Sequence, residues 1–486
     1  MAVHLQNHVF NRKAADCTHA AGRVYSLLGG QKMKGILVVS SSIFMLLGTS
    51  AYAEDSPETI RDEIRRMMNA YESRIRALEA RLAQTGTAVK KDDAKAGQLA
   101  GATDNTSRQA DGFNPEISLV LSGTATYLQH NPNDYQIAGF IPSGSEVAPG
   151  PRNFSLGESM LNFDADVGRA LHAKLALSLA PDSTVSLENA YIQSKNIDGG
   201  IGYTVGRFFS GIGYMNQQCL DDWDFADTSL PYKAFLGNQY KQDGIQLKWK
   251  MSPENLPMEW GVELGRGLGF PVAEENDSIA GALYVHVGGT AGTSNRWRAG
   301  LSYLGANPKE RSYEDTDALG VPTRNSFSGK SRLWVADFVW KWAPDGSPAM
   351  NSFKLQGEYF RRYEAGTLGC AGGNCAAGVS DRYQAVQSGW YLQGVYQFTP
   401  AWRVGWRHDR LNSGKLRLGA ALDPDDLPVL GAYTPKRNTL MVDYSPGASS
   451  RIRLQFTRDE SRLDATDNQL TLQYNVRLGG GHDEHE

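Results

Sequence analysis

From about residue 113 onward, apolar and polar side chains alternate along the chain with a period of two. This is the side-chain period of a β-strand whose two faces lie in different environments. The segment 389–410 shows the pattern in both arms of a hairpin, with apolar side chains at Trp390, Leu392, Tyr396, Phe398, Trp402, Val404 and Trp406. Charged and amide side chains stand between them, which is typical of strands that separate lipid from a wet interior.

Further segments show the same alternation. We place the strands at 117–128, 155–167, 170–180, 184–194, 200–209, 240–250, 257–267, 279–288, 294–305, 331–342, 350–362, 385–398, 401–412, 434–445, 450–460 and 467–478. Single-chain bacterial barrels have an even number of strands. The sequence therefore predicts an all-β membrane protein, with an antiparallel transmembrane β-barrel of about 16 strands over residues 113–478.

The lengths of the connections support this fold. With the first strand running outward, the inner connections are all short and fall at 168–169, 195–199, 251–256, 289–293, 343–349, 399–400 and 446–449. The long connections all fall at the outer end, at 129–154, 210–239, 306–330, 363–384 and 413–433. Membrane barrels have short inner turns and long outer loops, whereas a water-soluble sandwich has no reason to segregate its loops in this way.

A secretory signal peptide is predicted at residues 33–53. Lys32 and Lys34 supply its positive end, an apolar stretch too short for a mature transmembrane helix follows, and an Ala-Tyr-Ala cleavage signal ends at Ala53. We therefore expect export and a place in the outer membrane of a Gram-negative cell. Residues 1–32 lack signal-peptide features, so we interpret them as an overcalled extension before a true start at Met33. The alternative is an unusually long leader.

Residues 58–85 are predicted to form a short periplasmic coiled-coil helix. Its apolar residues are spaced alternately four and three apart, as in an a/d heptad seam, at Ile64, Met68, Tyr71, Ile75, Leu78 and Leu82. A helix this short is marginal alone, so we expect it to self-associate. The alternative is an amphipathic helix lying on the barrel. Residues 86–112 predict a flexible linker, and residues 479–486 predict a periplasmic tail rich in His and acidic residues.

Charge and cysteine usage exclude some partners. The net charge of −4, without a long Lys/Arg tract, gives no reason to expect a nucleic-acid partner. The four cysteines form no CxxC pair, so no structural zinc site is predicted. Cys370 and Cys375 bracket the hexapeptide CAGGNC, and in an oxidising compartment we expect a disulfide that closes a small outer loop. We predict no metal and no cofactor.

Several segments resemble a family of outer-membrane barrels related to the phosphate-selective (O/P-type) porins. They are FNPEISLVLSG, SLGESMLNFDADV, LENAYIQ, the block 206–249 and GWYLQGVYQF. The predicted coiled coil resembles that of trimeric dicarboxylate porins, which implies a homotrimer. Some relatives carry the label zinc-regulated TonB-dependent receptor. Residues 54–112 are too short and too polar to form the globular plug of such a receptor.

The third outer loop, 210–239, is our candidate for the pore constriction, because in 16-stranded porins the third loop folds into the pore. It carries Asp221, Asp222, Trp223, Asp224, Asp227 and Tyr232. The strand walls supply inward-facing basic residues at Lys248, Lys250, Arg298, Lys354, Arg403, Arg407, Arg451 and Arg453. An acidic loop opposite a basic wall would order charged or dipolar solutes in a transverse field. As alternatives, the acids can anchor the loop, lie in solvent or bind a cation, and the wall charges can pair with lumen acids.

These features predict a porin for selective passive diffusion of small hydrophilic solutes, anionic or dipolar, with outer-membrane lipid around it. The alternative is a protein for metal (zinc) binding or uptake, which rests on the Asp-rich loop, Cys219 and the tail at 482–486. An enzyme is not predicted. A barrel lipase needs Ser and His together at its rim, and His172, His286 and His408 show no obvious Ser partner.

Overall fold

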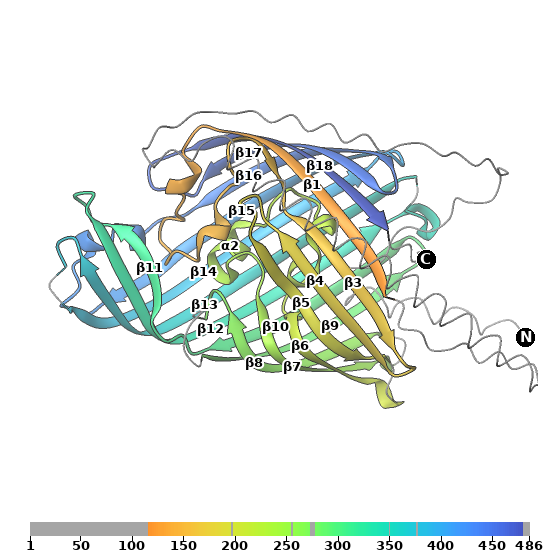
Figure 1. Cartoon of the computed structure of the whole chain (residues 1–486), viewed down its shortest axis with the longest axis horizontal. Coiled ribbons are helices and arrows are strands. Elements are labelled where there is room, and N and C mark those ends of the chain that lie inside the picture. The colour runs from red at the N-terminus through yellow and green to blue at the C-terminus, as the bar shows by residue number, and fades with distance from the viewer. Residues whose placement is uncertain are drawn as a thin grey trace, which may run out of the picture. The chain divides into compact units, whose positions relative to one another are not determined.

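The computed structural model describes residues 115–479, apart from 196–197, 254–255, 273–277, 349 and 376–377. Within these residues, all 18 strands belong to one sheet (Figure 1). The sheet closes on itself, because β1 (Glu116–Leu128) pairs with β18 (Asp467–Gly479) on one side and with β3 (Ser159–Val167) on the other. The wall is a closed 16-strand antiparallel β-barrel, and the predicted fold is confirmed.

The other wall strands follow one another around the barrel in chain order, so each connection is local. They are β4 (Leu171–Leu179), β5 (Val185–Ser194), β6 (Ile201–Phe209), β7 (Lys241–Met251), β8 (Met258–Leu268), β9 (Ile279–Ala291), β10 (Asn295–Ala306), β12 (Pro322–Trp342), β13 (Ser352–Gly372), β14 (Ser380–Gln397), β15 (Trp402–Leu418), β16 (Lys436–Gly447) and β17 (Ser450–Glu460). The connections contain the helix α2 (Leu230–Leu236) and short 3-10 helices at Pro132–Asp134, Ser145–Val147, Asp198–Gly200, Met215–Gln217, Leu220–Asp222, Pro344–Gly346, Pro424–Asp426 and Pro428–Leu430.

Two short strands add to this wall. β2 (Asn153–Leu156) pairs with the second half of β1, and β11 (Arg311–Thr316) pairs with the start of β12. The predicted strand 155–167 is therefore divided into β2 and β3. The break lies at Gly157, whose N–H donates to the backbone oxygen of Ser122 at 2.9 Å. A Cβ at Gly157 would lie 2.2 Å from Ser122 Oγ and 2.8 Å from Ser122 Cβ, so the Ser122 side chain leaves no room for a larger residue at this position.

The two faces of the wall differ as the alternation predicts. On β7, Ile245, Leu247 and Trp249 point outward and are 52 %, 50 % and 49 % exposed, whereas Gln246 between them is 3 % exposed. The same alternation continues on β14 and β15. Exposed apolar side chains therefore form a belt around the outside of the barrel, and polar side chains line its inside.

Four strands extend beyond their predicted outer ends. β12, β13, β14 and β15 continue the sheet into the predicted loops 306–330, 363–384 and 413–433. In these extensions the polarity of the two faces is inverted. Phe327, Leu368 and Tyr383 point inward and are fully buried, while polar residues such as Arg324 point outward. The apolar-out pattern that predicts a strand in lipid is therefore lost here, although the hydrogen-bonded ladder continues.

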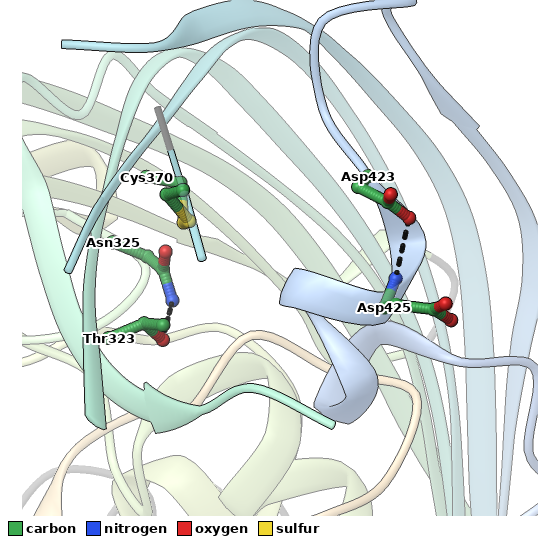
Figure 2. Close-up of a disulfide and its surroundings, with 6 residues drawn as sticks. Thr323, Asn325, Cys370, Asp423 and Asp425 are labelled. Atoms are coloured by element: carbon green, nitrogen blue, oxygen red, sulfur yellow. Dashed lines mark hydrogen bonds between the residues drawn. A yellow bond between two sulfur atoms is a disulfide. The ribbon is translucent and has the colours of Figure 1, made fainter. Parts of the chain in front are cut away.

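A disulfide closes the turn between β13 and β14. It joins Cys370, on the inward face of β13, to Cys375, and their Cα atoms are 5.9 Å apart. Figure 2 shows Cys370 near Asn325 of β12, its partner in the strand register, and Asn325 donates a hydrogen bond of 3.3 Å to Thr323 Oγ1. The disulfide therefore lies at the outer end of the sheet, where the extended strands are joined.

No helix in the described part of the chain is long and apolar enough to cross a membrane. The predicted extension (1–32), signal peptide (33–53), coiled coil (58–85) and linker (86–112) lie outside the described residues, and so does the tail beyond Gly479. These assignments stay predictions. Gly479 itself, which the sequence places in the tail, is the last residue of β18.

Candidate functional site

The connection between β6 and β7, residues 210–240, is a compact loop, named the inner loop below. Asn216 ties its two ends together. Its Nδ2 donates to the backbone oxygens of Ser210 and Tyr240 at 2.8 and 2.9 Å, and its Oδ1 accepts from the N–H of Tyr240 at 2.7 Å. α2 ends at Gly237 in the left-handed conformation that glycine adopts without strain. The inner loop is thus closed at its neck and internally structured.

Aromatic packing holds α2 against the inside of the wall. All residues of α2 are buried, and the helix contacts β13, β14 and β15 (Figure 1). The rings of Tyr232 and Phe235 lie 5.1 and 5.9 Å from the ring of Phe360 on β13. Phe140, from the connection after β1, packs edge-on against Phe235 at 5.6 Å. The largest apolar core of the described residues therefore lies inside the barrel, between two outer connections and the wall.

A buried carboxylate on β13 holds the start of the inner loop. Glu358 is 3 % exposed and accepts hydrogen bonds from the N–H groups of Tyr214 and Met215 at 3.1 and 3.0 Å. The hydroxyls of Tyr232 and Tyr391 also donate to it, at 2.9 and 2.6 Å. Four donors satisfy a carboxylate that burial would otherwise destabilise. Sequence reasoning gave Glu358 no role; its one signal was an inward-facing acid on a predicted strand.

Asp227 joins the inner loop to β15 and β16. Its carboxylate lies 2.7 Å from Arg437 Nη1 and 2.9 Å from Arg407 Nη2, and Lys233 Nζ of α2 lies 3.3 Å away. Burial alone would raise the pKa of Asp227. The charges of Arg437, Lys233 and Arg407 outweigh that effect and hold its pKa well below the usual range. The carboxylate is therefore ionised at neutral pH and binds three cations at once.

Asp224 makes a second anchor, to β13 and β15. Lys354 Nζ lies 2.9 Å and Arg403 Nη1 3.4 Å from its carboxylate, and Gln393 Nε2 donates to it at 3.0 Å. Burial alone would raise the pKa of Asp224, but the charges of Lys354 and Arg403 hold it well below the usual range. The middle of the inner loop is thus fixed at two carboxylates that stay charged.

Acidification should weaken these anchors only below about pH 4. When the loop is free of the wall, the pKa of each aspartate is about 3.9, and in the docked loop it is lower. The ionised carboxylates therefore stabilise the docked loop fully above about pH 4. This stabilisation is lost as the pH falls from about 4 towards the lower pKa of the docked loop. We expect the single-channel conductance of the refolded barrel to become unstable as the pH falls from about 4 to about 3. A conductance that does not change over this range would contradict the assignment.

Three other predicted loop residues are placed differently from one another. Asp221 forms an ion pair with Arg477 of β18, and its backbone oxygen accepts a hydrogen bond from Arg451. The backbone oxygen of Trp223, whose side chain is buried, accepts from Arg453 Nη2 at 2.9 Å. The carboxylate of Asp222 is 54 % exposed and lies 3.7 Å from Arg477. Of the four acids, Asp222 is therefore the one most open to solvent.

The structure brings most of the predicted loop and wall residues into direct contact, whereas the sequence analysis expected them to face each other across an opening. Direct contacts with the inner loop are made by Arg298, Lys354, Arg403, Arg407, Arg451 and Arg453. Charge-assisted hydrogen bonds between guanidinium or ammonium groups and oxygen atoms are strong when water is largely excluded, so loop and wall join instead of facing each other. The loop-anchoring alternative describes Asp221, Asp224 and Asp227.

Two basic residues of the anchor were missed by the sequence reasoning. They are Arg437 on β16 and Arg477 on β18. Arg437 shares the inward face of its strand with Thr439 and Asp443, so extending the alternation through 434–445 would have found it. The predicted Lys250 belongs elsewhere, since its ammonium lies 3.7 Å from Glu259 of β8.

A pocket lies between the start of the inner loop and the inward faces of β4 to β7. Its lining includes two basic side chains, Lys174 and Lys248, and the amides of Gln193, Gln217 and Gln246. None of the residues that line it is acidic. It therefore differs from the β13 to β18 side of the interior, where acidic and basic groups neutralise each other.

A metal site is poorly supported at the one group of possible ligands found among the described residues. Ligand atoms of Cys219, Asp221 and Asp222 all lie within 4.8 Å of one another. The guanidinium of Arg477, however, lies against both carboxylates. A bound cation would have to displace or repel that guanidinium.

No protein-family profile matches the chain. A protein of Aquifex aeolicus (strain VF5), described as an "Uncharacterized protein", is 26 % identical over an alignment of 397 residues, which covers 76 % of this chain and 79 % of that protein. Solved structures give similarities at low identity. OmpT, an outer membrane protein of Vibrio cholerae, in its trimer form has a TM-score of 0.46 at 12 % identity, covering 76 % of this chain and 100 % of that one.

Two further structures are similar at the same level. The outer membrane channel DcaP of Acinetobacter baumannii has a TM-score of 0.44 at 12 % identity, covering 78 % of this chain and all of that one. An anion-selective porin from Comamonas acidovorans has a TM-score of 0.43 at 8 % identity, covering 75 % of this chain and all of that one. With TM-scores below 0.5, these similarities do not establish a function for this chain, which has to follow from its own geometry.

Proposed function

We propose that this protein is an outer-membrane porin through which small hydrophilic solutes diffuse passively, with a preference for anionic or dipolar solutes. The observation that carries the proposal is the closed barrel itself. It is apolar outside and polar inside, and the inner loop narrows its interior. In such a barrel, polar solutes can cross the membrane through the interior without contact with lipid and without a conformational change of the protein.

The exterior supports a place in a membrane. Soluble monomers rarely expose contiguous apolar patches of more than a few hundred Å². Here large apolar side chains are exposed on strands around the wall, for example Leu264 on β8, Leu283 on β9, Leu440 on β16 and Leu472 on β18. The closed sheet also leaves no strand edge unpaired, as the lipid interior requires. The predicted signal peptide supports export to the outer membrane.

The distribution of charge inside supports a preference for anions. The acidic residues of the inner loop form ion pairs with basic residues of β13 to β18, among them Arg407, Arg437 and Lys354, so these charges are largely cancelled. The pocket along β4 to β7 has basic side chains and no acidic ones in its lining. A lining with lysines and without carboxylates favours anions over cations and orients dipolar solutes.

We further propose a homotrimer joined through the predicted coiled coil of residues 58–85. Three copies would bury the apolar seam of Ile64, Met68 and the residues that follow it at heptad spacing. The relation to O/P-type porins remains a resemblance of sequence.

Planar-bilayer recordings of the refolded protein (residues 54–486) test the function. We expect discrete conductance steps in KCl. Under a salt gradient, we expect a reversal potential whose sign shows that chloride is more permeant than potassium. A correctly folded barrel that does not conduct would overturn the porin assignment. A reversal potential of the opposite sign, which shows that potassium is more permeant, would overturn the anion preference but not the porin assignment.

A further inference from the structure

The outward face of β12 to β15 changes from aromatic to basic towards the outer end of the barrel. Along β12, the exposed outward side chains pass from Trp334 to Arg332. Along β13 they pass from Tyr359 to Arg361, and the same change occurs on β14 and β15. The exposed basic side chains of this surface, named the basic face below, are Arg332, Arg361, Arg382, Arg410, Lys415 and Arg417.

No acidic residue of these four strands shares the basic face. Their acids all occupy inward positions, and they are Asp337, Glu358, Glu364, Asp381 and Asp409. No side chain of the basic face forms an ion pair or a hydrogen bond with the described part of the chain, and Arg361 lies over the ring of Tyr363 at 5.2 Å. Arg324 and Lys330 lie nearer to β11, where Glu314 is opposite Arg324, and are not counted.

Outward basic residues on other strands have acidic partners near the outer end. Arg207 on β6 lies 2.7 Å from Asp243 on β7. Lys436 on β16 and Arg458 on β17 each lie 2.8 Å from Glu460. Like charges that lie close together on one face of a sheet are destabilising. The basic face, which lacks such partners, therefore suits an anionic partner from outside the chain.

The aromatic residues show at which depth the basic face lies. Trp334, Trp390 and Trp406 are 45 %, 37 % and 44 % exposed, and they lie at the end of the apolar belt that is nearest to the basic face. Tryptophan and tyrosine are enriched at the interface between the hydrocarbon and the head groups. Arg332 lies two positions beyond Trp334, which is about 7 Å along the strand. The basic face therefore begins at the depth of the lipid head groups.

Arg361 and Arg410 are placed to bind one anion together. In the strand register, Arg361 lies opposite Ser388 of β14, and Arg410 lies opposite Trp390 of the same strand. The two arginines are thus two strands apart, about 10 Å across the sheet, with the small Ser388 between them. Their long side chains can meet above Ser388, where the exposed Asn412 adds an amide. A guanidinium group binds phosphate oxygens with two parallel hydrogen bonds.

We propose that the basic face binds the phosphate groups of lipids in the outer leaflet, and that Arg361 and Arg410 hold one phosphate above Ser388. The acyl chains of this lipid lie on the apolar belt, which continues inward from Trp390 and Trp406. The continuity of the two surfaces favours a lipid over a soluble partner, because lipid covers the adjoining belt. The proposal goes beyond the porin function. It rests on the proposed location in the outer membrane and not on conduction.

Native mass spectrometry of the refolded protein (residues 54–486) in detergent tests the proposal. The probes are lipid A, which is a disaccharide lipid that carries phosphates, the same lipid after enzymatic removal of its phosphates, and inorganic phosphate. We expect saturable binding of lipid A and at least about tenfold weaker binding of the dephosphorylated lipid, because hydrogen bonds between charged groups are lost. Inorganic phosphate should compete no better than chloride at the same ionic strength, because it has no acyl chains.

Variants of the basic face locate the binding. The double variant Arg361→Gln, Arg410→Gln should bind lipid A at least about tenfold more weakly, because each basic residue near a membrane surface adds to the attraction of anionic lipid. Arg169→Gln with Lys341→Gln is the matched control, since it removes the same charge from exposed residues near the inner end of the barrel. This control should bind lipid A as the unchanged protein does. Ser388→Glu should also weaken binding, because it places a negative charge between the two arginines.

Three results would overturn the proposal. They are equal binding of the intact and the dephosphorylated lipid, equal losses in the two double variants, or a changed oligomer size with unchanged lipid binding in Arg361→Gln, Arg410→Gln. The last result would show that the basic face contacts another copy of the chain. If this variant does not refold, as judged by heat-modifiable electrophoretic migration, the comparison of the two lipids on the unchanged protein decides the question. Phosphate-dependent binding of lipid A to a barrel that does not conduct would support the proposal and contradict only the porin function.

Discussion

Replacing Asp227 with asparagine should release the inner loop from the wall and raise the conductance of the barrel several-fold. The substitution removes one of the two carboxylates that Arg407 and Arg437, both 1 % exposed, share, and leaves Asp409 of β15 as the other. Because the arginines keep one partner, we expect the loss to be that of hydrogen bonds to a charged group, about 1.5–3 kcal/mol. A loss of that size shifts the ratio of docked to released loop by about 10- to 100-fold.

Two measurements report on this release. Single-channel recordings should show larger and noisier steps, and trypsin should cut the loop at Lys233, which is buried in the docked state. Asp222→Asn is the matched control. It makes the same chemical change in the same loop, at a carboxylate that is 54 % exposed and only 3.7 Å from a single arginine. Equal conductance and equal trypsin resistance in Asp227→Asn and the unchanged protein would show that Asp227 does not anchor the loop.

Replacing Leu440 with arginine should strongly impair insertion of the barrel into lipid. Leu440 lies in the middle of β16, points outward and is 55 % exposed. An arginine on the lipid face near the bilayer midplane costs about 2–4 kcal/mol. We expect this loss in the free energy of folding into vesicles, measured by urea titration and by heat-modifiable migration.

The control for this prediction is Leu319→Arg. Leu319 is 78 % exposed, but it lies in the turn after β11, at the outer end of the barrel. The same substitution should leave folding into vesicles unchanged there. If both variants fold equally well, the exposed belt of apolar side chains does not lie in lipid, and the proposed location in a membrane is wrong.

The wall strands were predictable because their pattern is local. Each strand needs one face for lipid and one for the interior, so the alternation at Trp390 and Leu392 or at Ile245 and Leu247 is present in the sequence whatever the strand pairs with. Prediction failed where the environment changes. On the extended ends of β12 to β15 the outer face is polar and Phe327 faces inward, so the periodic signal reverses while the ladder continues.

The candidate site was predictable only in part. The loop 210–239 stood out by its length and its aspartates, and the basic wall residues Arg403 and Arg407 followed from the strand alternation. The pairing of these arginines with the loop aspartates did not follow from the sequence. Arg407 lies 180 positions from Asp227 in the chain, and whether two opposite charges meet or face each other across a gap depends on where the loop folds. The pocket around Lys174 has no sequence signal, because its lining comes from five separate segments.

The closed barrel follows from the amino-acid pattern alone, because a chain with alternating faces, an even number of strands and short inner turns has few other ways to pair its backbone groups in lipid. How the interior of the barrel is used depends on the three-dimensional fold. Glu358, Asp224 and Asp227 hold the inner loop on β13 to β16, and the two aspartates neutralise basic residues there, whereas no acidic residue lines the pocket along β4 to β7. Such charge pairs form between residues far apart in the chain, so they depend on distances that only the folded barrel sets.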